Sequence, residues 1–275
     1  MLDRELSVAI ELARGAGRIL MEIYAKDFTV AYKGKNDPVT EGDQLANAFI
    51  VAGLAEHFPE DGIVAEESVD LGHALSKRRC WFVDPLDGTK EFIAKNGEFS
   101  VMIGLAIDGV SALGVVYQPS LDKLYWGVVG DRAELEERGV TRELSVSEES
   151  DPSKLKLVVS RSHRPASIEQ IMQRLGATQE MPSGSVGVKV GLIAERTADL
   201  YVHISDKSSL WDACAPEAIL YAAGGRFVHV DGSAIQYATS DMKNRRGILA
   251  CNEATYTLVL DVVKDVSLEE GFLSA

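Results

Sequence analysis

The chain has 275 residues, and its content of 46% hydrophobic and 25% charged residues is typical of a soluble globular protein with one large or two medium domains. The net charge of −14 argues against binding to polymeric nucleic acid, because such proteins need a positively charged face to displace counterions from the phosphates. A small anionic substrate remains compatible with this charge, since bound divalent cations would meet its phosphate in place of the acidic side chains.

The cysteines indicate a reducing compartment. Cys80, Cys214 and Cys251 are odd in number, widely spaced and set in apolar surroundings, which disfavours a disulfide framework or a zinc cluster. No apolar run approaches the roughly 18 residues that span a bilayer, and the N-terminal segment lacks the charged-then-apolar order of a signal peptide. We therefore expect no transmembrane segment and a cytoplasmic location, with peripheral association with the inner membrane left open.

The first half of the chain predicts helices followed by strands. Apolar residues recur at three- and four-residue steps from Leu6 to Tyr24, which predicts an amphipathic helix. A second helical pattern begins near Asp43. A strand is expected at residues 81–83, and an antiparallel meander at residues 100–107, 112–117 and 124–129.

The second half predicts an alternation of strands and helices after a polar stretch at residues 145–154. Strands are expected at residues 155–160, 199–204, 226–230 and 247–251, and helices at residues 168–175, 188–195, 216–223 and 253–266. An α+β domain at residues 1–144 and an α/β domain at residues 145–275 follow from this change of pattern. Because the candidate functional acids come from both halves, we expect them to meet in a cleft.

The most informative stretch is residues 81–92, Trp-Phe-Val-Asp-Pro-Leu-Asp-Gly-Thr-Lys-Glu-Phe. Pro85 cannot donate to a strand ladder, so we expect a turn directly after Asp84. Asp84 and Asp87 would then leave the C-terminal end of the strand together. The alternative is an ordinary Asp-Gly turn with solvated acids, which the length and specificity of the whole string disfavour.

The same stretch suggests two kinds of ligand. The two carboxylates and the Leu86 carbonyl between them are hard oxygen ligands of the type that Mg²⁺ or Mn²⁺ prefers. Gly88 and Thr89 would open the next helix with free amides, which bind an oxyanion such as phosphate. The residues therefore predict a metal site beside a phosphate site.

Three further acids extend this pattern. Asp212 follows Trp211 and precedes a helix that ends at Gly224-Gly225, so a helix cap is its simplest role. Glu66 follows the apolar residues 62–64, and Asp43 lies at the start of the second helical pattern. Taken alone, each of these last two reads as part of a solvated loop or as a cap.

Together these segments resemble the magnesium-dependent, lithium-sensitive phosphomonoesterases of the inositol monophosphatase superfamily, over nearly the whole chain. The Asp-Pro-(Ile/Leu)-Asp-Gly-Thr motif of that family is intact at residues 84–89, and its Trp-Asp motif at residues 211–212. Lys-Glu-Phe-Ile at residues 90–93 and Asn-Gly-Glu-Phe-Ser-Val at residues 96–101 resemble the 3'(2'),5'-bisphosphate nucleotidase branch. The resemblance implies a layered αβαβα sandwich, of mixed α+β and α/β character, with the active site in the cleft between its halves.

The resemblance also implies roles for individual residues. The metal ligands would be Glu66, Asp84, the Leu86 carbonyl, Asp87 and Asp212. They would hold two or three Mg²⁺ ions, for which Mn²⁺ can substitute. Asp43 as base and the Thr89 hydroxyl as relay would polarise a metal-activated water that attacks the phosphoryl group directly. The amides of Gly88 and Thr89 would hold the phosphate.

A nucleoside 3',5'-bisphosphate carries a second phosphate that needs a pocket away from the metals. Short segments around residues 160–163 and 184–189 resemble the parts of the nucleotidase branch that contact the adenosine bisphosphate. The candidate substrate-binding residues there are Ser160, His163, Ser185 and Lys189, and Arg161 can assist them. His203 and His229 lie inside strand patterns and are interpreted as structural.

The leading interpretation is a phosphomonoesterase that converts adenosine 3',5'-bisphosphate to AMP and phosphate, a step in sulfur metabolism. One alternative is an inositol-phosphate or other sugar-phosphate phosphatase on the same scaffold. Another, from a different class, is a catalytically idle metal-binding regulator, which a missing ligand would favour; none is missing. The expected partner is a small phosphorylated molecule, and both a monomer and a homodimer are compatible with the sequence.

Overall fold

The structure, a computed structural model, describes residues 2–34, 37–69, 74, 76–162 and 164–274. Its helices are α1 (Asp3–Tyr24), α2 (Glu41–His57), α4 (Thr89–Ile93), α5 (Ser167–Leu175), α6 (Val186–Ala194), α7 (Cys214–Ala222) and α8 (Tyr256–Glu269), with 3-10 turns η1 (Pro152–Lys154) and η2 (Leu210–Asp212). The predicted helices are confirmed, with bounds that differ by a few residues.

Two sheets and a hairpin complete the fold. The large sheet contains, in spatial order, β10 (Val140–Glu143), β9 (Ala133–Glu137), β8 (Lys123–Val128), β7 (Val110–Gln118), β6 (Ser100–Ile107), β5 (Arg79–Asp87), β3 (Gly62–Ala65) and β4 (Ser68–Val69). The small sheet contains β12 (Gln179–Ser183), β11 (Lys156–Ser160), β13 (Leu200–His203), β15 (Ile248–Asn252) and β14 (Gly225–Val228). The hairpin is formed by β1 (Val30–Gly34) and β2 (Asp37–Thr40).

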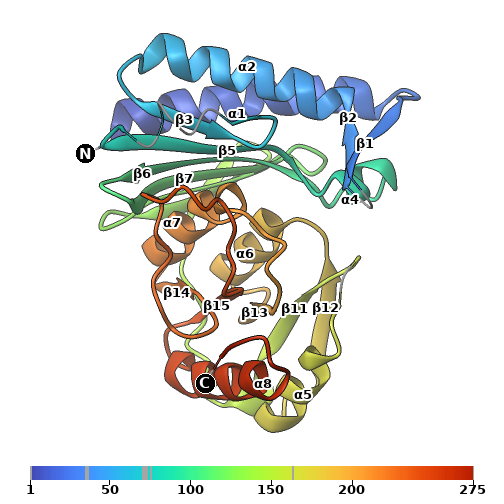
Figure 1. Cartoon of the computed structure of the whole chain (residues 1–275), viewed down its shortest axis with the longest axis vertical. Helices are drawn as coiled ribbons and strands as arrows, with labels where there is room; N and C mark the ends of the chain where they lie inside the picture. The colour runs from blue at the N-terminus through green and yellow to red at the C-terminus, as the bar shows by residue number, and fades with distance from the viewer. Residues whose placement is uncertain (1, 35–36, 70–73, 75, 163, 275) are drawn as a thin grey trace.

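The elements stack as five layers (Figure 1). α1 and α2 cover one face of the large sheet, and α6 and α7 lie between the large and the small sheet. α5 and α8 cover the remaining face of the small sheet. The predicted αβαβα sandwich is confirmed.

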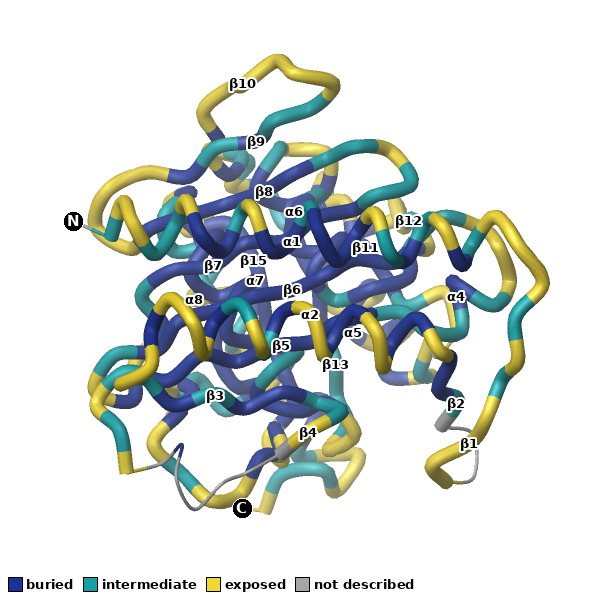
Figure 2. The backbone as a smooth tube through the Cα atoms, turned by 90° about the horizontal axis from the view of Figure 1, so that it is seen from above, coloured by how far each residue is buried: buried dark blue, intermediate teal, exposed yellow. Residues whose placement is uncertain are grey.

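The outer helices pack because their apolar residues fall on one side. Leu12, Ala16 and Leu20 of α1 are buried against the large sheet, and exposed residues recur between the buried ones along α1 and α2 (Figure 2). α2 begins with a capping box, in which Thr40 Oγ1 accepts a hydrogen bond from Gly42 N and Asp43 Oδ2 accepts one from Thr40 N. The cap fixes Asp43 in the first turn of α2.

Strand β5 carries the Asp-Pro-Leu-Asp motif and differs from the prediction in one respect. It continues through Pro85 to Asp87 instead of ending in a turn after Asp84. Because Pro85 has no N–H, the ladder to β6 shifts register between Asp84 and Asp87. In a regular strand, residues three apart point to opposite faces, so this irregularity lets both carboxylates line one pocket.

α7 approaches the large sheet closely. A Cβ at Gly114 of β7 would lie 2.1 Å from the Ala215 oxygen, and one at Gly104 of β6 would lie 2.6 Å from the Ala215 nitrogen. Only glycine allows this approach, which brings η2 and Asp212 beside β5. Asp212 does not cap α7 as the sequence suggested, because Ala213 holds that position and Asp212 Oδ2 instead accepts a hydrogen bond from Ser209 N.

The predicted boundary at residues 144 and 145 falls between β10, the last strand of the large sheet, and β11, the first strand of the small sheet. α7 comes from the second half of the chain, yet it packs on β6, β7 and β8 of the large sheet. The division into domains at residues 1–144 and 145–275 stays a prediction.

The state of the cysteines and the lengths of the helices relate to the predicted cellular location. Cys80, Cys214 and Cys251 are free and buried, and burial raises the thiol pKa of Cys80 and of Cys251 to about 12, which makes them poor nucleophiles. Across the described ranges, every helix is too short or too polar to cross a bilayer. The cellular location and the oligomeric state stay predictions.

Candidate active site

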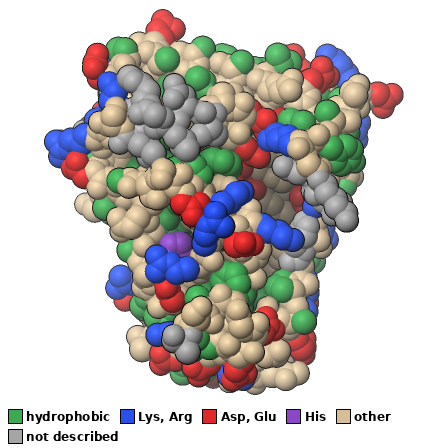
Figure 3. All heavy atoms as spheres, in the orientation of Figure 1, with side chains coloured by type: hydrophobic (Ala, Val, Ile, Leu, Met, Phe, Trp, Pro, Cys, Tyr) green, Lys and Arg blue, Asp and Glu red, His purple; other side chains and the backbone are tan. Residues whose placement is uncertain are grey.

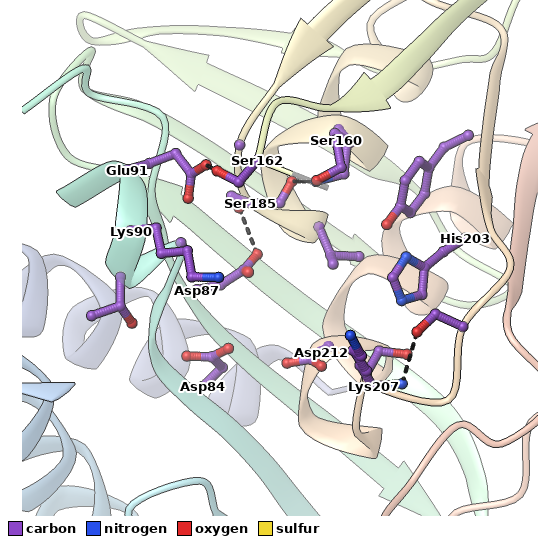
Figure 4. A pocket seen from close by; sticks show the side chains of 18 of the residues that line it. Asp84, Asp87, Lys90, Glu91, Ser160, Ser162, Ser185, His203, Lys207 and Asp212 are labelled. Carbon is purple, nitrogen blue, oxygen red and sulfur yellow. Dashed lines mark hydrogen bonds between the residues drawn. The ribbon is translucent and has the colours of Figure 1, made fainter. Parts of the chain in front are cut away.

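An open pocket of about 570 Å³ lies between the large-sheet half and the small-sheet half. Its walls come from residues 84–91 of β5 and α4, from the loops after β11 and β12, and from residues 201–212 that lead into α7. Figure 3 shows Lys and Arg side chains gathered across the middle of one face of the molecule, and Figure 4 shows the pocket from close by.

Five acidic residues line this pocket: the four predicted metal ligands Glu66, Asp84, Asp87 and Asp212, and also Glu91. Glu66 directly follows β3, the parallel neighbour of β5, and its amide donates to the Val83 carbonyl over 3.1 Å. The carboxylates of Asp84 and Asp212 face one another across the pocket floor (Figure 4). The structure therefore brings together all four predicted acidic ligands, and Leu86 lines the same pocket.

Each carboxylate is also held by a donor from the protein. Asp84 Oδ1 accepts from Leu86 N at 2.9 Å, and Asp212 Oδ2 accepts from Ser209 N at 2.6 Å. Asp87 Oδ2 accepts from Ser185 Oγ at 2.6 Å and from Gly187 N at 3.0 Å. Lys33 Nζ of the β1–β2 hairpin donates to Glu66 Oε1 over 3.2 Å. These bonds fix the orientation of the acids.

Burial raises the pKa of all four acids, and their mutual repulsion adds to it. The pKa of Asp212 and that of Glu66 rise to about 7, and for Glu66 burial outweighs the opposing charge of Lys33. The pKa of Asp84 lies well above its usual range because of burial and the neighbouring carboxylates. For Asp87, burial outweighs the lowering effect of the nearby Lys189 ammonium on its pKa. Such concentrated negative charge favours binding of a cation.

A divalent cation fits this set of donors by its chemistry. Carboxylate and carbonyl oxygens are the hard ligands that Mg²⁺ prefers, and its charge would relieve the repulsion among the acids. Within the described ranges, no three or more His, Cys, Asp and Glu side chains already form a group that could hold a metal ion. Coordination by Glu66, Asp84, the Leu86 carbonyl, Asp87 and Asp212 therefore stays a prediction.

Asp43 and Thr89 are connected by a hydrogen bond at the edge of this cluster. Thr89 Oγ1 lies 3.2 Å from Asp43 Oδ1, to which it donates, and 3.3 Å from the Leu86 carbonyl oxygen. Burial raises the pKa of Asp43, while hydrogen bonds from the Thr40 side chain and amide oppose that rise. The pair thus has the hydroxyl and carboxylate contact that a proton relay requires.

Gly88 and Thr89 begin helix α4 as expected. Gly88 is the N-cap residue and has φ +98°, a left-handed conformation that favours glycine. A Cβ there would also lie 3.0 Å from the Glu98 carbonyl oxygen. The first amides of a helix have no partner within the helix. Both residues line the pocket, but binding of phosphate by their amides stays a prediction.

The predicted substrate-binding residues fall into two groups. Ser160, at the end of β11, lines the pocket, whereas His163 lies outside the described residues. Ser185 and Lys189 line the pocket as well, but Ser185 Oγ donates to Asp87 and Lys189 Nζ donates to the Ser185 carbonyl over 2.7 Å. Burial lowers the pKa of Lys189, and its ammonium lies 5.0 Å from the centre of the Tyr201 ring.

Several pocket residues were not predicted from the sequence. His203, interpreted above as structural, lines the pocket together with Lys207, and both belong to the wall at residues 201–212 (Figure 4). Arg164 also lines the pocket and binds Glu180. The sequence did contain a signal for Lys207: it lies among several serines at residues 205–209, just before the Trp-Asp motif, and such a cluster of polar side chains beside a functional motif could have indicated a substrate-binding loop.

The five-layered fold and the acid-lined pocket define the class of protein. The chain belongs to the inositol monophosphatase family, whose model matches residues 1–268. Within that family it is 38% identical over 235 residues to the 3'(2'),5'-bisphosphate nucleotidase CysQ of Salmonella typhimurium, a match that covers 84% of this chain and 93% of that protein.

Two solved structures are similar to this fold. CysQ from Bacteroides thetaiotaomicron matches with a TM-score of 0.78 and 30% identity, over 91% of this chain and 97% of that one. An inositol monophosphatase from Anabaena matches with a TM-score of 0.78 and 29% identity, over 98% of this chain and 96% of that one.

Proposed function

We propose that the chain is a 3'(2'),5'-bisphosphate nucleotidase that removes the 3'-phosphate of adenosine 3',5'-bisphosphate and releases AMP. The observation that carries this proposal is the convergence of the four predicted acidic ligands, Leu86 and the start of α4 on one pocket. Such a site suits a dianionic phosphate ester, because hydrolysis requires neutralisation of the phosphoryl oxygens. Similarity to proteins named 3'(2'),5'-bisphosphate nucleotidase supports this substrate class.

Glu66, Asp84, the Leu86 carbonyl, Asp87 and Asp212 would hold Mg²⁺. When bound there, the metal would neutralise charge on the phosphoryl oxygens and lower the pKa of the attacking water. The remaining chemistry belongs to the chain. The amides of Gly88 and Thr89 orient the phosphate by donating to its oxygens.

Thr89 and Asp43 handle the proton of the attacking water. The Thr89 hydroxyl accepts a hydrogen bond from that water and donates its own proton to Asp43 Oδ1, which is 3.2 Å away. Asp43 is suited to this task because its pKa is raised by burial, which makes the carboxylate a better base. Its other oxygen is held by Thr40 N and Thr40 Oγ1, both at 2.7 Å, so the base stays aligned.

The second phosphate of the substrate needs a cation that is not already engaged. Arg164 binds Glu180 at 2.8 Å, and Lys189 is buried and donates to the Ser185 carbonyl. The Lys207 side chain lines the pocket and has no hydrogen bond or ion pair with any residue that the structure describes. Lys207 is therefore the better candidate for the 5'-phosphate, with Ser160 as a hydroxyl donor, and Lys189 acts as a fixed counter-charge to Asp87.

Identification of the nucleotide product tests this function. With Mg²⁺ present, the protein is expected to convert adenosine 3',5'-bisphosphate to 5'-AMP and phosphate, and excess chelator is expected to stop the reaction. Formation of 3'-AMP would reverse the proposed orientation of the substrate. An unchanged rate in chelator would refute the metal-dependent mechanism.

A further inference from the structure

The segment from Glu91 to Glu98 follows the metal motif and resembles the nucleotidase branch, yet none of its residues takes part in the proposed hydrolysis. It contains the end of α4 and the turn into β6, where Gly97 has φ +80°. The turn is fixed to the large sheet, since the Gly97 carbonyl accepts from Gln118 Nε2 at 2.9 Å and from Ser120 Oγ at 2.6 Å. This segment is therefore attached to the large-sheet half.

Glu98 extends from this segment to two loops of the other half. Its carboxylate accepts two hydrogen bonds from the Arg161 guanidinium, at 2.6 and 2.5 Å, and one from the Gly184 amide at 2.8 Å. Arg161 also donates to the Pro182 carbonyl over 3.0 Å. Glu98, Arg161 and Gly184 form a contact that we call the clasp.

Glu91 makes a parallel contact deeper in the pocket. Its carboxylate accepts a hydrogen bond from the Ser162 hydroxyl, and the two side chains point toward one another in Figure 4. A Cβ at Gly184 would lie 2.4 Å from Glu91 Cγ and 2.5 Å from the Glu98 carbonyl oxygen, so the loop at Gly184 lies directly against the segment. Two acids seven residues apart thus hold two loops of the opposite half.

These loops form the pocket wall that is contributed by the small-sheet half. Ser160 ends β11 and Ser162 lies in the loop after it, while Gly184 and Ser185 come from the loop after β12. The second loop continues to the hydrogen bond between Ser185 and Asp87. The loops after β11 and β12 would contact the remote part of the substrate, and residues 84–89 would hold the metal. The clasp therefore connects these loops to the metal motif.

The clasp is stronger than a typical surface ion pair. The Arg161 guanidinium and the Glu98 carboxylate form a bidentate ion pair, and the Gly184 amide adds a third charge-assisted hydrogen bond. Burial opposes ionisation of Glu98, but the bonds from Arg161 and Gly184 lower its pKa, so the carboxylate is charged at neutral pH. Arg161 is thereby engaged within the protein and does not serve as a free anion ligand.

We propose that the clasp sets the position of the loops after β11 and β12, and that Glu98 is a positioning residue for selectivity toward substrates with a second, remote phosphate. This inference rests on the proposed function. A substrate without a remote group does not reach these loops, so it gains nothing from their position. The contribution of Glu98 is therefore expected in KM for the bisphosphate.

The test compares Glu98→Gln and Arg161→Gln with a matched control, Glu253→Gln. Glu253 forms a similar bidentate ion pair with Arg226 outside the pocket. Glu98→Gln is expected to raise KM for adenosine 3',5'-bisphosphate about ten-fold, with a change in kcat below about three-fold. Both constants for p-nitrophenyl phosphate, and those of the control, are expected to stay within about two-fold of the unaltered protein.

Two further readouts separate positioning from simple loss of structure. The double variant Glu98→Arg with Arg161→Glu is expected to recover part of the bisphosphate KM, because it restores the ion pair in reverse. Hydrogen exchange is expected to accelerate at the Arg161 and Gly184 amides in Glu98→Gln, and to stay unchanged at Asp87 and Thr89.

The outcomes distinguish this inference from the proposed function. Unchanged exchange at Arg161 and Gly184, or equal KM increases for both substrates, would overturn the clasp. A double variant whose KM increase is no smaller than the combined increases of Glu98→Arg and Arg161→Glu made singly would also overturn it. Failure of the unaltered protein to hydrolyse the bisphosphate would refute the proposed function, and the exchange measurement would still decide whether the clasp orders the loops.

Discussion

Replacement of Asp43 by Asn separates its role as a base from its role in the helix cap. Asn can keep the cap, because its amide oxygen can accept from Thr40 N as Asp43 Oδ2 does at 2.7 Å. Its NH₂ group would then face Thr89 Oγ1, which now donates to Asp43 Oδ1 over 3.2 Å. The Thr89 hydroxyl would become the acceptor and could no longer pass a proton on.

The expected loss of activity follows from the loss of general-base catalysis. Such a group contributes about 10²- to 10⁴-fold, which corresponds to roughly 3 to 5 kcal/mol of transition-state stabilisation. The expected change in the free energy of unfolding is below about 1 kcal/mol, or a few degrees in Tm, because the cap persists. Phosphate release at saturating Mg²⁺ and thermal unfolding measure the two effects.

Thr40→Val is the matched control for Asp43→Asn. It removes the hydroxyl that donates to Asp43 and accepts from Gly42 N, so it weakens the cap and leaves the carboxylate in place. We expect a stability loss of about 1 kcal/mol and a fall in kcat of less than about ten-fold. Similar kcat losses in the two variants, or a kcat near that of the unaltered protein in Asp43→Asn, would refute the relay.

Three other predictions concern the metal, the second phosphate and pH. Asp84→Asn and Asp212→Asn are each expected to lower kcat by orders of magnitude and to weaken Mg²⁺ binding in calorimetry, with the fold intact; near-normal turnover at low Mg²⁺ would refute the ligand role of that residue. Lys207→Gln is expected to raise KM for the bisphosphate about ten-fold with little effect on a monophosphate, and the exposed Lys264→Gln serves as its control; a parallel change for both substrates would contradict the assignment. Buried Glu217, which accepts from the Tyr237 hydroxyl at 2.5 Å, has its pKa raised from 4.5 to about 8 by burial, so its contribution to stability is complete below pH 4.5 and is lost as pH rises through 8. In denaturant unfolding of the Mg²⁺-saturated protein, the unaltered chain is expected to lose on the order of 5 kcal/mol of stability over that range, and Glu217→Gln is expected to abolish this loss. Identical pH profiles of the two proteins would contradict the assignment.

Much of the fold was predictable because its elements carry local signals. The periodicity of α1, the meander of β6 to β8 and the helix before Gly224 each depend on nearby residues, and all three were confirmed. Strands β1, β2, β3, β4, β9, β10 and β12 were missed. β10 is exposed along its length, and β12 contains Pro182, so neither has the apolar alternation that marks a strand.

The active site likewise contains residues that could be predicted from the sequence and contacts that could not. Asp84 and Asp87 belong to one long sequence motif, and the family resemblance assigned Glu66 and Asp212 to the same site, so the convergence of the four acids could be predicted. Asp212 reaches β5 only because Gly104 and Gly114 let α7 lie against the large sheet, which is a tertiary contact. The clasp joins Glu98 to Arg161 across 63 positions of sequence, and no local pattern indicates which charged residues will pair over that separation.

The substrate preference of the unaltered protein tests the central claim most directly. Released phosphate would be measured in Mg²⁺ with adenosine 3',5'-bisphosphate, inositol 1-phosphate and fructose 1,6-bisphosphate at matched concentrations. The proposed function predicts that kcat/KM for the nucleotide exceeds that for inositol 1-phosphate by at least about ten-fold, since the clasped loops and Lys207 favour a remote phosphate. Fructose 1,6-bisphosphate also carries a remote phosphate, so its kcat/KM measures how strongly the nucleoside itself is selected. A higher kcat/KM for inositol 1-phosphate would contradict the nucleotidase and favour the sugar-phosphate phosphatase instead.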